Sequence, residues 1–262
     1  MKAVSGVFRS RSDAEHALVE MHSLGLRDDQ ITLLTPEKME SGLQSVPAVA
    51  SEQPGMGKAM GAVLGGATGL SGAALVMAAI PGVGVITAMG LLGAALLGAA
   101  GAGIGAAAGG KLENSMTEGL PEDELFVYED ALRRGRSVLV ALAEDGAAAA
   151  RLRELLKAEG AETVDAARDQ WWIGLRDAEK EHYSTLGKKF GDDEKLYRLG
   201  FESALHARTR CKEYDQVMGE MTAQVEDLEH QYPGVEVAVP FTRGYERGRD
   251  YYQQLCSKPR AA

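Results

Sequence analysis

The pattern of apolar and polar positions divides this chain into parts with different periodicities. Residues 1–36 and 112–167 combine short apolar runs typical of strands with stretches whose apolar residues recur at helical spacing. Residues 37–56 between them have no clear period and are expected to be a linker. From residue 168 to 262, aromatic and charged residues alternate at helical spacing, which predicts a C-terminal helical domain.

The two outer segments predict an α+β domain that is split by an insertion. Strands are expected at Lys2–Phe8, 30–35, Ser137–Ala143 and 162–166. Helices are expected after the first strand, over 121–134 and over 147–158, with Ser12 or Asp13 as the first N-cap and Gly160 as the last stop. Two β-α-β halves predict a ferredoxin-like fold with a four-stranded antiparallel sheet.

Residues 59–110 carry no charged side chain, and they are long enough for two bilayer-crossing helices of about 20 residues each. Pro81, Gly82 and Gly84 predict a turn near the middle. Glycines recur every four residues on both sides of that turn, so each helix would present a side-chain-free face. These rows are Gly57, Gly61, Gly65 and Gly69, then Gly101, Gly105 and Gly109. Residues 57–111 are therefore predicted to form a glycine-zipper helical hairpin that also drives homo-oligomerisation.

The α+β segments resemble a known family at several short motifs. Val7-Phe8, Ser12-Asp13-Ala14-Glu15 and Leu24-Gly25 before the insertion are similar to the small general-stress-protein domain of bacteria. The runs 119–122 and 128–135, leading into the strand at 137, are similar to the same domain. Related proteins also carry a glycine-zipper hairpin between the two halves. The resemblance covers about residues 1–167 and implies a stress-associated, non-catalytic bacterial protein, with no catalytic residue to carry over.

Two environments are open for the predicted hairpin. Lys58 and Lys111 flank the hairpin and would lie on the same side of a membrane, as the positive-inside tendency favours. The N-terminus lacks the apolar core of a signal peptide. The first expectation is therefore insertion in the bacterial inner membrane, with lipid as a partner and both other domains in the cytoplasm. The alternative is a cytoplasmic ring, cage or filament that buries the hairpins between subunits. A flexible linker is disfavoured, because large apolar residues recur through the segment.

The C-terminal domain contains a short internal repeat. Tyr197-x-x-Gly200-Phe201-Glu202 matches Phe241-x-x-Gly244-Tyr245-Glu246. We expect three or four helices over about 170–256, with the two glycines at close helix crossings and the aromatic rings packed over them. This arrangement resembles an uncharacterised helical domain of bacterial stress-related proteins. Trp171 and Trp172 are interpreted either as a hydrophobic anchor between domains or as a belt at a membrane interface.

Composition and motifs argue against most chemistry. The net charge of −10 and the pI near 5.1 disfavour nucleic acid as a partner, and the two cysteines are expected to be reduced thiols. Arg243, Arg247 and Arg249 alternate with acids and predict a solvated, salt-bridged face. Glu179 and His182 have the spacing of half a di-metal site, but no second half follows. No enzyme, metal, cofactor or small-molecule substrate is predicted, although a ligand sensor stays open by analogy with other ferredoxin-like sheets.

Overall fold

The computed structural model describes residues 2–36, 75–80, 84–89, 122–186, 189–206, 209–210, 212 and 214–257. The chain divides into two compact units. The first unit comprises Met1–Leu120 and Ala131–Thr163, and the second comprises Pro121–Asp130 and Val164–Ala262. The helical domain predicted from residue 168 thus begins four residues earlier, and it also takes in Pro121–Asp130, which the sequence assigned to the α+β domain.

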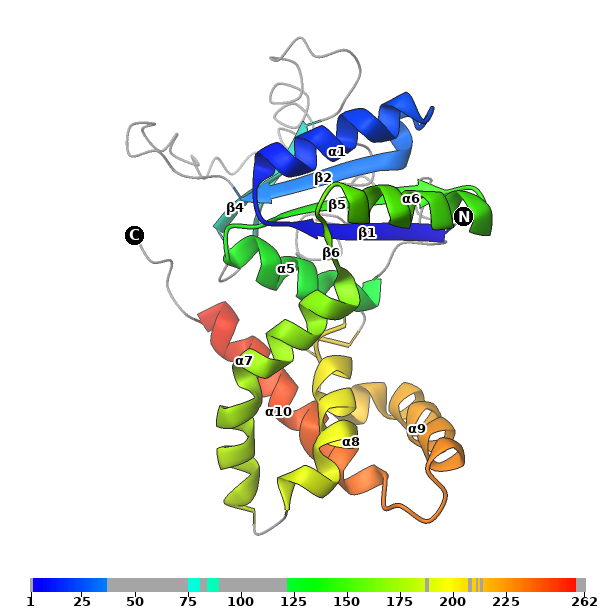
Figure 1. Cartoon of the computed structure of the whole chain (residues 1–262). Helices are drawn as coiled ribbons and strands as arrows, with labels where there is room; N and C mark the ends of the chain where they lie inside the picture. Colours follow the sequence, from blue (N-terminus) through cyan, green and yellow to red (C-terminus); the bar gives the residue numbers. More distant parts are fainter. Residues whose placement is uncertain are drawn as a thin grey trace, which may run out of the picture. The chain divides into compact units, whose positions relative to one another are not determined.

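The first unit is built on an antiparallel sheet, and its class is α+β as predicted (Figure 1). The strands that the structure describes stand in the order β3-β4-β2-β5-β1-β6. They are β1 (Lys2–Phe8), β2 (Ile31–Pro36), β3 (Leu75–Ile80), β4 (Gly84–Met89), β5 (Ser137–Ala143) and β6 (Glu162–Thr163). Strand β5 pairs with β1 on one side and β2 on the other. The predicted strand at 162–166 is shorter in the structure, because helix α7 begins at Val164.

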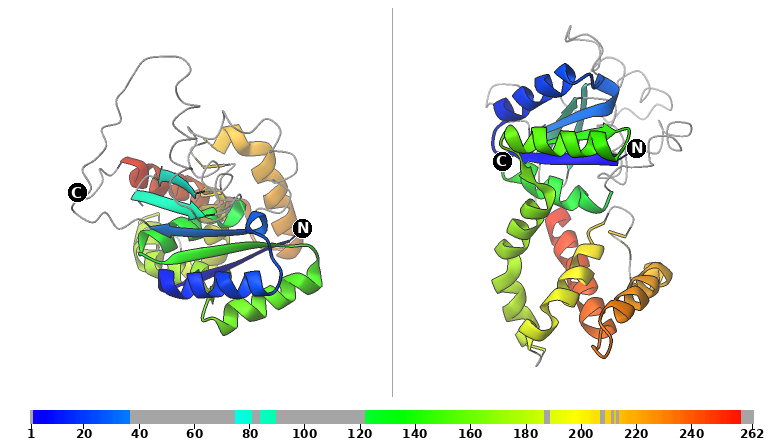
Figure 2. Two further views of the ribbon diagram at one scale, coloured as in Figure 1. Left: turned by 90° about the horizontal axis from the view of Figure 1, so that it is seen from above. Right: turned by 45° about the vertical axis from the view of Figure 1, so that its right-hand side comes forward.

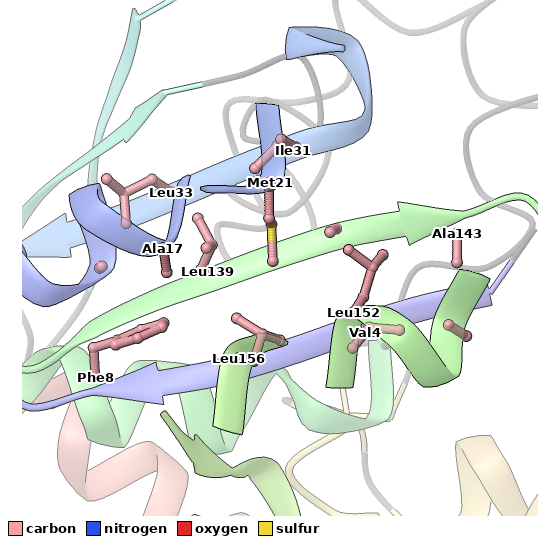
Figure 3. Packing of buried hydrophobic residues seen from close by; sticks show 13 residues of the cluster. Val4, Phe8, Ala17, Met21, Ile31, Leu33, Leu139, Ala143, Leu152 and Leu156 are labelled. Atoms are coloured by element: carbon pink, nitrogen blue, oxygen red, sulfur yellow. The ribbon is translucent and has the colours of Figure 1, made fainter. Parts of the chain in front are cut away.

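Helices α1 (Arg11–Ser23) and α6 (Gly146–Ala158) pack on one face of this sheet (Figures 1 and 3). A single cluster of buried residues joins them to the strands, and it includes Phe8, Leu33 and Leu139. The hydroxyl of Ser10, rather than Ser12 or Asp13, caps α1 by accepting a hydrogen bond from the Asp13 amide at 3.1 Å. Gly160 follows α6 with a φ of +82°, which confirms it as the helix stop.

Strand β5 is apolar at almost every position because both of its faces are buried. Leu139 and Ala141 point into the helix-covered cluster, while Val138 and Val140 alternate with them and are also fully buried. A half-exposed antiparallel strand would show alternation between apolar and polar residues instead. The strong strand signal of Ser137–Ala143 therefore reflects a central position in the sheet.

The middle of the segment predicted as a helical hairpin is a β-hairpin, so the helical prediction is wrong at 75–80 and 84–89. Strands β3 and β4 pair antiparallel with Ile80 opposite Gly84, and β4 pairs with β2. The chain reverses where the turn was predicted, since Gly84 opens β4, although Pro81 and Gly82 lie outside the described residues. The β-branched residues Val76, Val85, Ile86 and Thr87 favour strands over helices.

A buried hydrogen bond between threonines fixes the register of β4 against β2. Thr35 and Thr87 face each other across the two strands, and their hydroxyl oxygens are 2.7 Å apart. Both side chains are buried, at 4% and 7% exposure. Each hydroxyl satisfies the other, so neither polar group is left without a partner away from water.

The second unit is helical, which confirms the predicted class of the C-terminal domain (Figure 2). It contains the 3₁₀ turn Glu122–Glu124 and α5 (Leu125–Arg133) as far as Asp130, and its other described helices are α7 (Val164–Ser184), α8 (Phe190–Ser203), α9 (Tyr214–Gln231) and α10 (Ala238–Ser257). A buried cluster including Met221, Phe241 and Tyr245 joins α8, α9 and α10. Helices α8 and α10 are the most extensively packed pair, and they cross at the repeated motif.

Candidate functional site

The crossing of α8 and α10 is built around the repeated glycines, as the sequence predicts. A Cβ atom at Gly200 would lie 2.8 Å from the carbonyl carbon of Phe241 and 3.0 Å from the amide nitrogen of Tyr245. A Cβ atom at Gly244 would lie at the same two distances from the carbonyl carbon of Tyr197 and the amide nitrogen of Phe201. The obstructing atoms are backbone, so only glycine lets the helices approach this closely. We call this contact the glycine crossing.

The matching distances give the glycine crossing a local two-fold symmetry. Each glycine faces the aromatic residue three positions before its counterpart and the aromatic residue directly after it. Gly248 extends the contact by one helical turn, because a Cβ atom there would lie 3.0 Å from the Cα of Phe201. The internal repeat is therefore a helix-pairing motif that meets its own second copy within the chain.

Aromatic rings surround the crossing, and both tryptophans belong to this cluster. Between ring centroids, Trp171 lies 4.9 Å from Phe126 and 5.9 Å from Phe201, and Trp172 lies 5.8 Å from Phe201. Their exposures are 2% and 3%. The Trp172 indole also donates a hydrogen bond to Glu194 at 3.1 Å. Both tryptophans are thus core residues of the helical unit, and the structure places neither of them as an exposed belt for a membrane interface.

A buried ion pair lies beside the crossing, and the sequence predicted other surroundings for both of its members. Glu179 on α7 is almost fully buried and accepts hydrogen bonds from the guanidinium of Arg247 at 3.0 Å. The hydroxyl of Tyr197 donates to the same carboxylate at 2.8 Å. Burial and the negative charge of Glu179 raise the pKa of Tyr197, so the phenol keeps its proton. Both carboxylate oxygens are occupied, which favours positioning of α7, α8 and α10 over proton transfer.

Two predictions about single residues change with this geometry. Arg247 was expected on a solvated face, but it points inward to Glu179, while Arg249 does pair with the exposed Asp250 at 3.3 Å. Glu179 was half of a weak metal motif, yet its carboxylate is paired with Arg247 and His182 is exposed. Among the residues that the structure describes, no group of three His, Cys, Asp or Glu side chains is placed to hold a metal ion.

Two further ion pairs lie in the helical unit. Arg210 and Glu129 form an ion pair at 2.7 Å with side-chain exposures of 5% and 6%, across 81 positions of sequence. Glu202, the glutamate of the first repeat, pairs with Arg198 at 2.6 Å. Burial raises the pKa of Glu202 in spite of this partner. The second repeat differs here, because Glu246 is exposed.

The sheet of the first unit ends differently on its two sides. On one side, β6 is two residues long, and its Glu162 forms an ion pair with Arg136. On the other side, β3 is six residues long and consists of Leu, Val, Met, Ala and Ile alone. No described strand pairs with the side of β3 that faces away from β4, which we call the outer edge. Such an edge is a template for another strand.

The glycine rows themselves cannot be placed. Gly57, Gly61, Gly65, Gly69, Gly101, Gly105 and Gly109 all lie outside the described residues. Between these rows, the structure describes residues 75–80 and 84–89, which belong to the sheet. Among the described helices, none combines the length and the apolar character that a bilayer crossing requires.

Comparisons with protein-family models, with curated proteins and with solved structures find no match to this chain.

Proposed function

We propose that this chain is a non-enzymatic bacterial stress-associated protein that forms homo-oligomers through its charge-free segment, residues 59–110. In this proposal the segment is covered by further copies of the chain, as in a ring, cage or filament, rather than by lipid. The stress association rests on the resemblance of residues 1–167 to the bacterial general-stress-protein domain.

The observation that carries the proposal is the pairing of β3 and β4 with the rest of the sheet. Strands β2, β3, β4 and β5 belong to one sheet. The chain therefore has to return to that sheet twice, once between β2 and β3 and once between β4 and β5. A bilayer excursion that returns to the same side needs two crossings, or about 40 apolar residues. Residues 59–74 and 90–110 are each too short for that. The pairing therefore favours a protein partner over lipid for the charge-free segment.

The fold of the first unit is proposed to be ferredoxin-like with β3 and β4 added at one edge. The order β2-β5-β1-β6 and the position of α1 and α6 on one face support this proposal. So does the arrangement of two β-α-β halves in sequence, with the added hairpin inserted between them.

A mass measurement and a fractionation together test the proposal. Light scattering of the purified chain without detergent should give a multiple of 27.8 kDa. Gly65→Leu, within a predicted glycine row, should lower that mass, because a large side chain would separate closely packed backbones. Gly219→Leu is the matched control, since nothing lies within 4 Å of a Cβ there, and it should leave the mass unchanged.

Two outcomes would contradict this proposal in different ways. A mass of one chain at micromolar concentration would remove homo-oligomerisation. Retention of the protein in a carbonate-washed membrane pellet would instead favour the lipid-inserted hairpin expected from the sequence.

A further inference from the structure

The sequence and pairing of β3 carry none of the devices within an edge strand that block strand addition, and no described strand pairs with its outer edge. Natural edge strands are short or carry lysine, proline, a bulge or an inward charge. Strand β3 spans Leu75–Ile80 without any charged residue, proline or glycine, and it pairs with β4 over all six positions without a bulge. Its length and composition are those of a strand that another strand could extend.

The opposite end of the same sheet shows what a protected edge looks like in this protein. Strand β6 offers only Glu162 and Thr163 before the chain turns into α7. The ion pair between Glu162 and Arg136 places charge at that edge. Because one edge is short and charged while the other is long and uncharged, strand addition is directed to β3.

We propose that β3 pairs antiparallel with β3 of a second copy of this chain, so that two sheets continue into one across a two-fold axis. This inference rests on the proposed homo-oligomerisation and names the element that makes the contact. A two-fold axis at the edge of a sheet necessarily relates a strand to an antiparallel copy of itself. The pairing supplies main-chain hydrogen bonds without demanding any particular side-chain complement.

Charge favours a second copy as the occupant. The chain carries a net charge of −10, so two copies repel each other over most of their surfaces. Strand β3 itself carries no charged residue, so identical copies can pair along it without placing like charges opposite each other. A charged partner would find no complementary charge within β3 to recognise.

Cysteine scanning tests the pairing directly. With Cys211→Ser and Cys256→Ser as background, single cysteines are placed in turn at each position from 75 to 80. In an antiparallel two-fold pair, one step along the strand changes the separation of symmetry mates by about 6.6 Å, twice the rise per residue. Disulfide-linked dimers should therefore peak at one position or two adjacent ones and fall on both sides. Equal yields at all six positions would indicate a parallel pair and would overturn the proposal.

Edge lysines provide an independent test. Ala78→Lys and Ala79→Lys lie on opposite faces of the strand, and each should weaken dimerisation at least tenfold by the like charge that it brings to the axis. The matched controls Ala78→Gln and Ala79→Gln have similar length without charge and should weaken it less. Far-UV circular dichroism of each variant shows that the sheet still forms.

The outcomes separate this inference from the proposed function. An oligomer whose β3 cysteines never cross-link, and whose mass is unchanged by either lysine, would overturn the β3 pairing and leave homo-oligomerisation standing. A wild-type chain that is monomeric by light scattering would overturn both.

Discussion

A methyl group at the glycine crossing should destabilise the helical unit, whereas the same change elsewhere in a helix should stabilise it. In Gly200→Ala the new Cβ would lie 2.8 Å from the carbonyl carbon of Phe241, whereas unbonded carbon atoms prefer about 3.5–4.0 Å. The Cβ would come closer still to the carbonyl oxygen of Phe241, so the helices would have to separate by more than roughly 1 Å. The obstructing atoms are backbone and cannot rotate away, so we expect the upper end of the overpacking range, about 3 kcal/mol.

The intrinsic preference of alanine for helices opposes this loss by about 1 kcal/mol. The net expectation for Gly200→Ala is a decrease of about 2 kcal/mol in the free energy of unfolding. Gly219→Ala on α9 is the matched control, because its Cβ would meet nothing within 4 Å. It should raise the free energy of unfolding by about 0.5–1 kcal/mol.

Gly244→Ala should cost the same as Gly200→Ala, because the two sites have matching surroundings. The double variant should cost clearly less than the sum, since the separation forced by one methyl group makes room for the other. Urea unfolding followed by tryptophan fluorescence measures these values in the helical unit, where both tryptophans lie. Stabilisation by Gly200→Ala, or additive losses in the double variant, would refute the close crossing.

Three further outcomes follow from the ionised groups. Arg247→Met should lower the free energy of unfolding, measured by urea titration, by about 3 kcal/mol. This is the low end of the range for breaking a buried ion pair, because 23% of the Arg247 side chain is exposed. Adding Glu179→Gln should recover much of the loss, because it removes the unpaired buried charge. Burial raises the pKa of Glu202 above 4.5, so stability should fall as pH rises from about 4.5 through the folded-state pKa, and Glu202→Gln should remove this part of the slope. The hydrogen bond with Glu159 raises the pKa of His16 above 6.5, so the ion pair is lost as pH rises through this raised pKa. In Glu159→Gln, the pKa of His16 measured by NMR titration should return towards 6.5.

Local periodicity was sufficient for most of the α+β unit and for the helix repeat. The strands Lys2–Phe8 and Ser137–Ala143 follow from β-branched and apolar runs, and Gly160 marks the end of α6. The repeat around Gly200 and Gly244 also predicted close helix crossings, because glycine flanked by aromatic residues in a helix is typical of them; that its two copies meet each other is a finding of the structure. In these cases the residues that determine the structure are neighbours in sequence.

Residues 75–80 and 84–89 of the charge-free segment were mispredicted because the strand that β4 pairs with, β2, is distant in sequence. Nothing in the sequence near Thr87 indicates that it meets Thr35, 52 positions away. Strand propensity depends on the neighbouring strand more than on the residues themselves. The β-branched run at 85–87 was the available signal.

The ion pair of Glu179 and Arg247 was missed for a related reason. Arg247 is followed by other charges on α10, which is typical of a solvated face. Only the crossing, which brings α10 against α8 and α7, shows that one arginine of the series points inward. Sequence spacing on one helix does not reveal which face a second helix covers.

The most direct test of the central claim is whether β4 lies beside β2 in the protein in solution. In the background without native cysteines, Thr35→Cys with Thr87→Cys should form a disulfide, because these residues face each other across the two strands. Mass spectrometry of the tryptic peptides identifies the link, and Thr35→Cys with Ala88→Cys, shifted to the opposite face, is the control. We predict linkage in the first pair and none in the second. A reduced Thr35–Thr87 pair under oxidising conditions would mean that residues 84–89 are not part of the sheet, and both the favoured assembly and the β3 contact would be contradicted.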